Sequence, residues 1–265
     1  MRDSVRLPIP DARNTPSRPL SVWLGGRIGI DAYGSLAERL AWEVSEPDGR
    51  GPTLLLYEPE PAITIGRLGS RTDVDLTDDE LRSRRLELRF VGRGGGAVPH
   101  GPGQVGVSLF AALDDLGFTR HDVGGYVERF EAALEGVVRT LRCSAARDSR
   151  THGIFGRSGL LAAVGIAVRR GVVWHGGFLN VQPDLDLFRR VRSVPVADAA
   201  GMRRMGSIEA DVRRKVRLQD ARSAVVQQFV DAFAFSRSHV QSGVPAPFPH
   251  GASGHGRPER TSRVG

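Results

Sequence analysis

Two long apolar segments lie next to each other in the second half of the chain and constrain its fold most strongly. Residues 160–168 and 172–181 are rich in Val, Ile, Leu and Ala, and only Arg169-Arg170-Gly171 separates them. Apolar and β-branched runs of this length, joined by a short segment that contains glycine, are typical of a β-hairpin. The sequence therefore predicts two neighbouring strands here.

Further strands and helices are predicted on both sides of this hairpin. Apolar runs predict strands, and apolar residues that recur every three or four positions predict helices. The expected strands are residues 21–28, 53–57, 62–66 and 86–91, and the expected helices are residues 31–46, 125–141, 218–235 and one that begins with a capping box at 77–80. This order indicates an α/β (α+β) fold, a mixed β-sheet flanked by helices.

Two of the expected helices have a clear apolar face. In residues 125–141, Glu128 and Arg129 fall outside that face. We interpret the aromatic residues of both helices as core residues, because their spacing is that of a buried helix face. The predicted core residues are Tyr126, Phe130, Leu134, Val138 and Leu141 in the first helix and Ala221, Val225, Phe229 and Phe233 in the second.

The two ends of the chain differ in composition from the part between them. Residues 1–20 contain four prolines and little apolar periodicity, which is typical of a flexible leader. Residues 238–265 are rich in Ser, Gly, Pro and His, which is typical of a disordered tail. Residues 21–237 contain no linker and no internal repeat, so the sequence predicts one catalytic-type domain there.

Composition limits the classes of function. Cys143 is the only cysteine, which excludes an internal disulfide framework and a cysteine-based zinc site, and the seven histidines show no metal-ligand spacing. The two ends account for +5 of the net charge of +7, so we expect no nucleic-acid binding, and the mildly basic surface suits an acidic protein partner. No apolar run approaches 18 residues and no signal peptide is evident, so we expect a cytoplasmic protein without a membrane segment.

A glycine-rich segment, residues 93–104, follows the strand expected at 86–91. Six of its twelve residues are Gly or Ala, which leaves the backbone accessible, and Arg93, His100 and Gln104 add three polar side chains. No Gly-Lys-Ser/Thr follows, and the glycine spacing does not fit a dinucleotide-binding loop. Two interpretations remain: a tight turn between strands, and a loop that holds a substrate.

The order of residues in this segment is more specific than its composition. Arg93-Gly94-Gly95 is followed, after four residues, by His100-Gly101-Pro102-Gly103-Gln104. This order resembles the Arg-Gly-Gly-x-x-Thr-aromatic-His-Gly-Pro-Gly-Gln loop of lipoyl/octanoyl transferases, in the biotin/lipoate protein ligase superfamily. Val98 and Pro99 depart from the Thr and aromatic positions, and the Gly-Gly-Gly-Ala-Val core is more similar to the ATP-dependent lipoate ligases of that superfamily. Residues 51–67, 162–165 and 175–181 resemble further family segments in the same order.

The resemblance implies a fold, an activity and partners. The implied fold is the biotin/lipoate protein ligase catalytic domain, with an acyl-binding site at the open face of its sheet. Family members move a medium-chain acyl group from acyl carrier protein to a lysine of a lipoyl-domain protein, so these are the implied partners; no cofactor and no metal are implied. The implied substrate-binding residues are Arg93, Gly94, Gly95, Gly96, Ala97, Val98, Pro99, His100, Ala163, Val164, Gly165, Gly176, Gly177 and Phe178.

The chain lacks the family's reactive pair at the matching positions. In the family a cysteine thiolate takes the acyl group as a thioester, and a nearby lysine lowers the pKa of that thiol. Counting from the matching motifs places the lysine position at Leu160 and the cysteine position at Val196, both apolar. The only lysine, Lys215, lies far beyond the expected place, and Arg157 cannot act as a base because its guanidinium stays protonated.

Several candidate groups and functions therefore remain open. Cys143 is a candidate for a relocated nucleophile, and His100 and His175 are candidate bases for direct transfer; each also has a structural interpretation. The retained glycine-rich segment favours an acyltransferase of divergent mechanism. The paired loss of the cysteine and lysine favours a catalytically inactive homologue that binds a lipoyl or octanoyl group or a lipoyl domain. An ATP-dependent lipoate ligase is a third hypothesis, against which Leu160 counts because that chemistry also uses the lysine.

Overall fold

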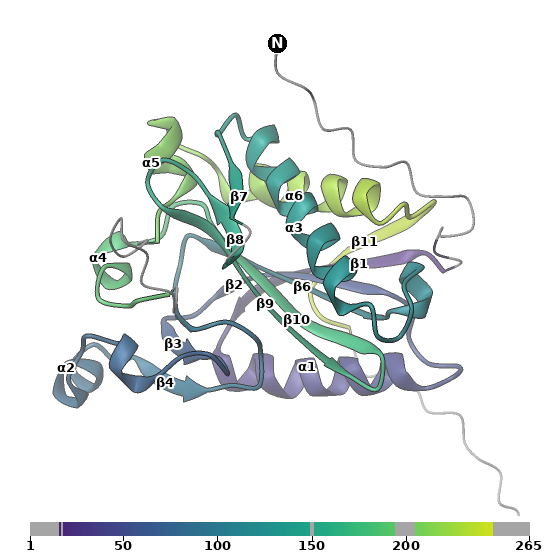
Figure 1. The fold of residues 1–265 in the computed structure, drawn as a ribbon, viewed down its shortest axis with the longest axis horizontal. Helices are drawn as coiled ribbons and strands as arrows, with labels where there is room; N and C mark the ends of the chain where they lie inside the picture. The colour runs from purple at the N-terminus through teal and green to yellow at the C-terminus, as the bar shows by residue number, and fades with distance from the viewer. Residues whose placement is uncertain (1–15, 17, 149–150, 194–204, 246–265) are drawn as a thin grey trace, which may run out of the picture.

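The computed structural model describes residues 16, 18–148, 151–193 and 205–245, which form two β-sheets covered by helices (Figure 1). The strands of the large sheet are β1 (Leu20–Ile28), β2 (Thr53–Pro59), β6 (Gln104–Ala112), β7 (Ala146–Asp148), β8 (Thr151–Phe155), β9 (Leu160–Arg169), β10 (Val172–Asn180) and β11 (Ser238–Ser242), in the order β11-β1-β2-β6-β10-β9-β8-β7. The small sheet consists of β3 (Ala62–Ile65), β4 (Glu87–Phe90) and β5 (Ala97–His100), in the order β4-β3-β5. The helices are α1 (Ile30–Ser45), α2 (Asp78–Ser83), α3 (Val123–Thr140), α4 (Leu185–Phe188), α5 (Ile208–Val212) and α6 (Leu218–Ala232), with short 3₁₀ turns at Arg71–Asp73 and Asp114–Leu116.

The hairpin predicted from the two apolar segments is formed by β9 and β10. The two strands pair antiparallel, and the turn residues Arg170 and Gly171 both have positive φ, 52° and 80°. Two successive positive φ values are typical of the type I′ turn, whose twist matches that of the strands. β1 pairs parallel with β2 and β11, whereas β2, β6 and β10 pair antiparallel, so the expected mixed sheet is confirmed.

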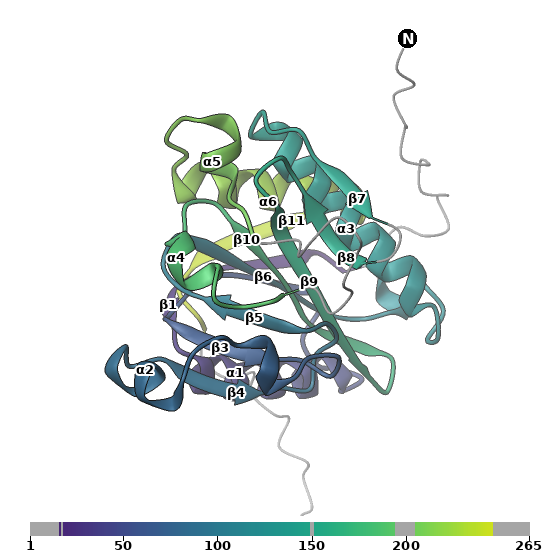
Figure 2. The same ribbon diagram turned by 60° about the vertical axis from the view of Figure 1, so that its left-hand side comes forward.

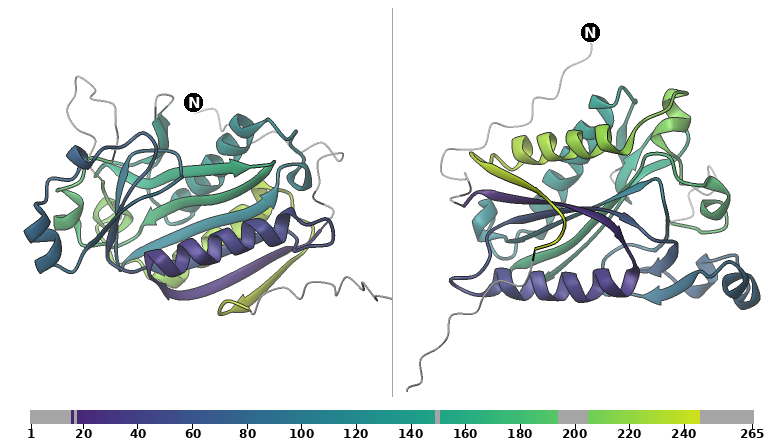
Figure 3. Two further views of the ribbon diagram at one scale, coloured as in Figure 1. Left: turned by 90° about the horizontal axis from the view of Figure 1, so that it is seen from below. Right: turned by 180° about the vertical axis from the view of Figure 1, so that it is seen from behind.

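Alternate residues of the central strands face opposite sides of the large sheet. Leu54 and Leu56 of β2 belong to the cluster that α3 and α6 cover, whereas Leu55 and Tyr57 belong to the cluster under α1. Figures 1 and 3 show α3 and α6 on one side of the sheet and α1 on the other. The sheet is therefore buried on both faces.

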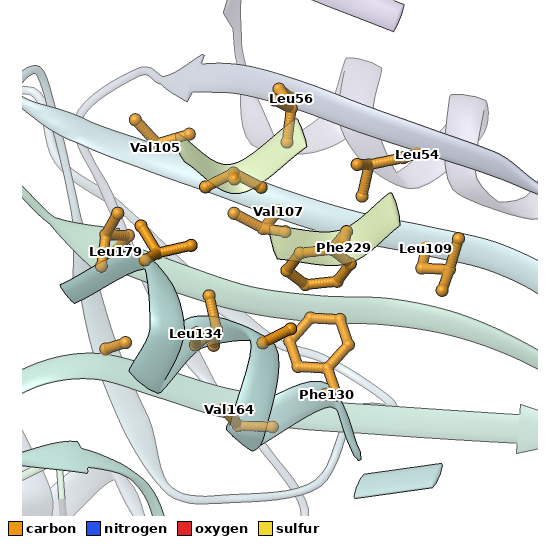
Figure 4. Close-up of a cluster of buried hydrophobic side chains, with 14 of the residues drawn as sticks. Leu54, Leu56, Val105, Val107, Leu109, Phe130, Leu134, Val164, Leu179 and Phe229 are labelled. Atoms are coloured by element: carbon orange, nitrogen blue, oxygen red, sulfur yellow. The ribbon is translucent and has the colours of Figure 1, made fainter. Parts of the chain in front are cut away.

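The core between the sheet, α3 and α6 contains the residues predicted from helical spacing. All nine predicted core residues of the two helices belong to one cluster of buried side chains. Phe130 of α3 meets Phe229 of α6 edge to face, with ring centroids 4.9 Å apart and an interplanar angle of 86° (Figure 4). The apolar faces of both helices are confirmed.

The small sheet lies beside the N-terminal end of α1 (Figures 2 and 3). An ion pair at 3.4 Å joins Arg89 of β4 to Asp31 in the first turn of α1. The predicted capping box at the start of α2 is also present, because the Thr77 hydroxyl accepts from the Glu80 N–H and the Glu80 carboxylate accepts from the Thr77 N–H. No helix within the described ranges is both long enough and apolar enough to cross a membrane.

Three of the sequence expectations are corrected by the structure. Residues 97–100 of the glycine-rich segment form β5, and Pro99 is tolerated there because β5 is an edge strand of the small sheet. The last helix ends at Ala232, and Ala234 then has a φ of 55°, which a helix cannot continue. β6, buried along nearly its whole length, was not among the expected strands.

The expected ends of the domain also change. The disordered tail predicted from residue 238 is wrong for Ser238–Ser242, which form β11 beside β1. All five side chains of β11 are exposed, so the strand is held by backbone pairing and has no apolar pattern to reveal it. Leu20 already belongs to β1, and residues 1–15, 17 and 246–265 of the predicted leader and tail lie outside the described residues.

Candidate functional site

A cavity of about 360 Å³ lies between the α1 face of the large sheet and the small sheet. Its wall includes residues of β2, β6, β9 and β10, of the glycine-rich segment and of the first turn of α1, and it is mostly apolar. This volume is within the roughly 300–1,000 Å³ range of small-molecule sites. No group of three or more His, Cys, Asp or Glu in the described part of the chain is arranged to hold a metal ion.

Most of the expected substrate-binding residues line this cavity. Those on its wall are Arg93, Gly95, Gly96, Val98, His100, Ala163, Val164, Gly165, Gly176 and Phe178. Val164 also places its side chain in the core under α3 (Figure 4). The fold therefore brings residues from three separate segments of the chain together around one cavity.

Four expected residues are not on the wall. Ala97 belongs to the core of the small sheet, and Pro99 lies in β5 opposite Ile63. The N–H of Gly94 donates to the carbonyl of Ile166 at 2.9 Å and so attaches the glycine-rich segment to β9. A side chain at Gly177 would point to the α3 side of the sheet, so this glycine serves core packing.

Gly165 allows the glycine-rich segment to lie directly against β9. A Cβ atom at this position would be 2.7 Å from the carbonyl oxygen of Gly94, closer than real Cβ contacts. Gly95 then turns the segment with a φ of 80°. Backbone therefore meets backbone at this wall of the cavity, which only glycine at residue 165 permits without displacement.

Arg93 is the structural centre of the glycine-rich segment. Its Nη1 donates to the carbonyls of Gly94 and Gly96 at 2.9 and 3.1 Å, and its Nη2 donates to the carbonyl and hydroxyl of Thr64 at 3.1 and 2.6 Å. All four terminal N–H groups are thus used within the protein. Burial lowers the pKa of Arg93 to about 10, which leaves it charged at neutral pH. Arg93 lines the cavity, and its guanidinium holds the glycine-rich segment in place.

Gln104, the third polar residue of the segment, is also used internally. Its Nε2 donates to Asn180 Oδ1 at 2.8 Å, and its Oε1 accepts from the N–H of Gly101 at 3.0 Å. Asn180 in turn donates to the carbonyl of Leu160 at 2.9 Å. Gln104 and Asn180 join β6, β10 and β9 behind the cavity wall.

His100, another polar residue of the segment, also lines the cavity. It is 3% exposed; its Nε2 lies 2.7 Å from Thr64 Oγ1, and its ring centroid lies 4.2 Å from that of Phe178. Burial, followed by the charge of Arg93, holds the pKa of His100 well below its usual range. The imidazole is therefore neutral at physiological pH.

A second polar group lies where α1 meets the sheet. The Tyr33 hydroxyl is 2.9 Å from Ser108 Oγ and 3.3 Å from His175 Nδ1. Burial raises the pKa of Tyr33 to about 12, and burial together with Arg93 lowers the pKa of His175 to about 4, so both side chains are neutral near pH 7. His175 has a φ of 62°, a conformation uncommon for a residue other than glycine.

The sequence analysis missed several residues of the cavity. Ser193 and Thr151 line it, and each has a buried hydroxyl without a hydrogen-bond partner among the described residues. Ser108 had a detectable signal, because it is a polar residue within an apolar run, whereas Tyr33 and Thr64 look like ordinary helix and strand residues. Their roles depend on contacts between distant segments.

Residues 35–230 match the family model of the lipoyl protein ligase A/B catalytic domain. The chain belongs to this family. The octanoyltransferase of Geotalea uraniireducens is 34% identical over 205 residues, which are 77% of this chain and 88% of that protein. The octanoyltransferase of Mycobacterium leprae is 32% identical over 219 residues, 77% of this chain and 87% of that protein.

The fold of this lipoyl protein ligase A/B family member is also that of solved lipoate ligases. A bi-partite lipoate protein ligase from Thermoplasma acidophilum superposes with a TM-score of 0.67, covering 86% of this chain and 88% of that chain, at 18% identity. The expected biotin/lipoate protein ligase catalytic-domain fold is confirmed. The transferase-like character inferred from the glycine-rich segment is likewise supported by the named relatives.

Leu160, the residue expected at the family's lysine position, is a packed apolar side chain. Leu160 is 2% exposed and belongs to a cluster with Val98, Phe188 and Met205. Val196, the residue expected at the family's cysteine position, lies outside the described residues. Lys215 is exposed and is not on the cavity wall, so the structure brings no lysine to the site.

Cys143 is remote from the cavity wall. It follows α3 in the core cluster, is 5% exposed, and its Sγ lies 3.5 Å from Asp211 Oδ2. Burial, followed by the Asp211 carboxylate, raises the pKa of this thiol to about 12. The thiol therefore stays protonated and is not placed to act as the relocated nucleophile.

Proposed function

We propose that this protein is an acyltransferase of the octanoyltransferase type. It binds an octanoyl or lipoyl group in the cavity and passes it from acyl carrier protein to a lysine of a lipoyl-domain protein. The observation that carries this proposal is the mostly apolar cavity built from the segments that match the family. The names of the relatives support the same acyl group.

The α1 face of β9 and β10 supplies the surface for the acyl chain. Gly165 and Gly176 lie opposite each other on the two strands, and Ala163 lies opposite Phe178. A Cβ at Gly165 would meet the Gly94 carbonyl oxygen, and one at Gly176 would meet the Val107 carbonyl oxygen, so both glycines let neighbouring backbone form part of this face. Each methylene removed from water contributes about 0.8 kcal/mol, so burial alone can hold a medium-length chain.

The residues of the site favour direct transfer without a covalent acyl-enzyme. Leu160 has no ionisable group, and Cys143 lies outside the cavity. In a direct step, the amine nitrogen of the acceptor lysine attacks the thioester carbonyl carbon. The new C–N bond forms as the C–S bond breaks, and the amine proton passes to the departing thiolate. The protein contributes by holding the two reactants in the productive orientation.

The test is to incubate the purified protein with octanoyl-acyl carrier protein and an apo lipoyl domain and to measure the mass of the acceptor. We expect a gain of one octanoyl group on its lysine, above a control without the protein. A variant with the cavity wall displaced, Gly165→Val, is the matched control for background transfer. No gain above either control contradicts the proposal.

Leu160 favours a second function, which is binding without turnover. Its side chain packs in an apolar cluster and offers no proton donor or acceptor, and the sequence motifs led us to expect the family's lysine there. This function predicts that isothermal titration calorimetry detects binding of octanamide or of an apo lipoyl domain while the acceptor mass stays unchanged. Absence of both kinds of binding contradicts it.

A further inference from the structure

The hydroxyl of Thr64 lies between a guanidinium and an imidazole. Arg93 Nη2 donates to Thr64 Oγ1 at 2.6 Å, because a guanidinium has no lone pair with which to accept. His100 Nε2 lies 2.7 Å away on the same oxygen. The hydroxyl has one hydrogen to donate. Among the described residues, His100 Nε2 is the acceptor that lies within hydrogen-bond distance of it. If His100 Nε2 carried a hydrogen, Thr64 would accept from both side chains and its own hydrogen would have no acceptor among the described residues, so the arrangement that uses every group has Thr64 donating to Nε2.

This hydrogen bond decides where His100 carries its proton. The ring is neutral, because burial and the neighbouring Arg93 charge disfavour the imidazolium. A neutral imidazole carries one hydrogen, on either Nδ1 or Nε2. Since Nε2 accepts from Thr64, the hydrogen is on Nδ1.

The Nδ1–H group is buried and has no hydrogen-bond partner among the described residues. Buried donors in native proteins are nearly always paired, so an unpaired donor on a residue of the cavity wall points to an acceptor that is supplied when a ligand binds. His100 is 3% exposed and lines the cavity, with its ring against Phe178. The rest of the cavity wall is mostly apolar.

We propose that the Nδ1–H of His100 is a fixed hydrogen-bond donor for the carbonyl oxygen of the bound acyl group. This inference rests on the proposed function. A saturated acyl chain has no donor, and its carbonyl oxygen is the strong acceptor it brings into the cavity. Arg93 and Thr64 are then positioning residues, which act through His100 by setting its tautomer.

This assignment changes the role of His100 from candidate base to donor. The carbonyl oxygen gains negative charge when a nucleophile adds to the carbonyl carbon, so a donor already in place favours that step. The nearby charge of Arg93 acts in the same direction. The lone pair that a base would need, on Nε2, is occupied by Thr64.

The tautomer can be measured directly by ¹⁵N NMR of histidine-labelled protein. The His100 signals are assigned by their absence from the spectrum of His100→Gln. We expect a protonated, pyrrole-type Nδ1 and an unprotonated, pyridine-type Nε2, with no titration between about pH 6 and 8. Thr64→Ser should keep this pattern, and Thr64→Val should lose it. A pyridine-type Nδ1 in the wild-type protein overturns the inference.

Two substitutions at His100 separate its two nitrogens. Asn places an amide nitrogen near the position of Nδ1, and Gln places one near the position of Nε2. With octanamide as the probe, calorimetry should show His100→Asn within about threefold of the wild-type affinity and His100→Gln weaker by about tenfold, the value of one hydrogen bond. Melting temperatures check that both variants are folded.

The outcomes distinguish the inference from the proposed function. Equal octanamide affinities for the Asn and Gln variants contradict the role of His100 alone. Failure of octanamide to bind the wild-type protein contradicts both the role of His100 and the acyl-binding function of the cavity. Turnover is not needed for either measurement.

Discussion

Gly165→Ala tests whether close backbone contact builds the cavity wall. The added Cβ would lie 2.7 Å from the Gly94 oxygen and 3.1 Å from Arg93 Cδ, whereas ordinary contacts begin at 3.4 Å. The glycine-rich segment must therefore shift by several tenths of an ångström, away from β9. Overpacking of this kind costs about 1–3 kcal/mol. The shift also stretches the Gly94 N–H bond to Ile166.

The expected effect follows from the size of the domain. A loss of 1 kcal/mol lowers the melting temperature of a domain of this length by about 2–4 °C, so Gly165→Ala should melt about 2–12 °C below the wild-type protein. Thermal unfolding followed by circular dichroism measures this shift, and calorimetry with octanamide measures the accompanying loss of affinity. The matched control is Gly92→Ala, because a Cβ at residue 92 meets nothing within 4 Å. If the two variants melt together and bind octanamide equally, the close-contact argument is refuted.

Three further predictions concern single side chains. Cys143→Ala should leave acyl transfer within about twofold of the wild-type rate. Iodoacetamide should label native Cys143 only slowly, with a rate that keeps rising above pH 9 because the thiol pKa is about 12. Fast labelling at pH 7 would contradict this prediction. Burial raises the pKa of Asp211, but hydrogen bonds from Ser158 and Arg157 outweigh this effect and leave the pKa lowered. Asp211→Asn should therefore lower the free energy of unfolding by about 1 kcal/mol at pH 7. Urea unfolding should show this difference shrinking below about pH 4, where the carboxylate becomes protonated. Phe178→Ala should weaken octanamide binding by roughly tenfold or more, measured by calorimetry, because it removes apolar wall.

The pattern of apolar residues predicted much of the fold. The β9–β10 hairpin and the buried faces of α3 and α6 follow from local periodicity, which burial on one face imposes on any amphipathic element. β11 could not be found in this way, because its side chains are exposed and its backbone is paired with β1, more than two hundred residues earlier in the chain. Long-range pairing of this kind leaves no local pattern.

The candidate site was predictable as a set of segments but not as a set of roles. Most of the residues expected from residue order line the cavity, including Gly165 and Phe178, but much of the wall comes from residues that were not expected. Residue order could not reveal that the terminal N–H groups of Arg93 are used by the backbone around it and by Thr64. Cys143 was open as a nucleophile until its burial beside Asp211 was known.

The sequence by itself determined the β9–β10 hairpin, the buried faces of α3 and α6, and the glycine-rich segment, since each of these depends on residues that are neighbours in the chain. The tertiary structure alone decided which polar atoms already form hydrogen bonds within the protein and which are left to bind a ligand. Thr64 and His100 are 36 residues apart, and only the pairing of β3 with β5 places them on one side of the small sheet. Because a buried hydrogen bond is directional and short, its presence depends on that packing and not on residue type.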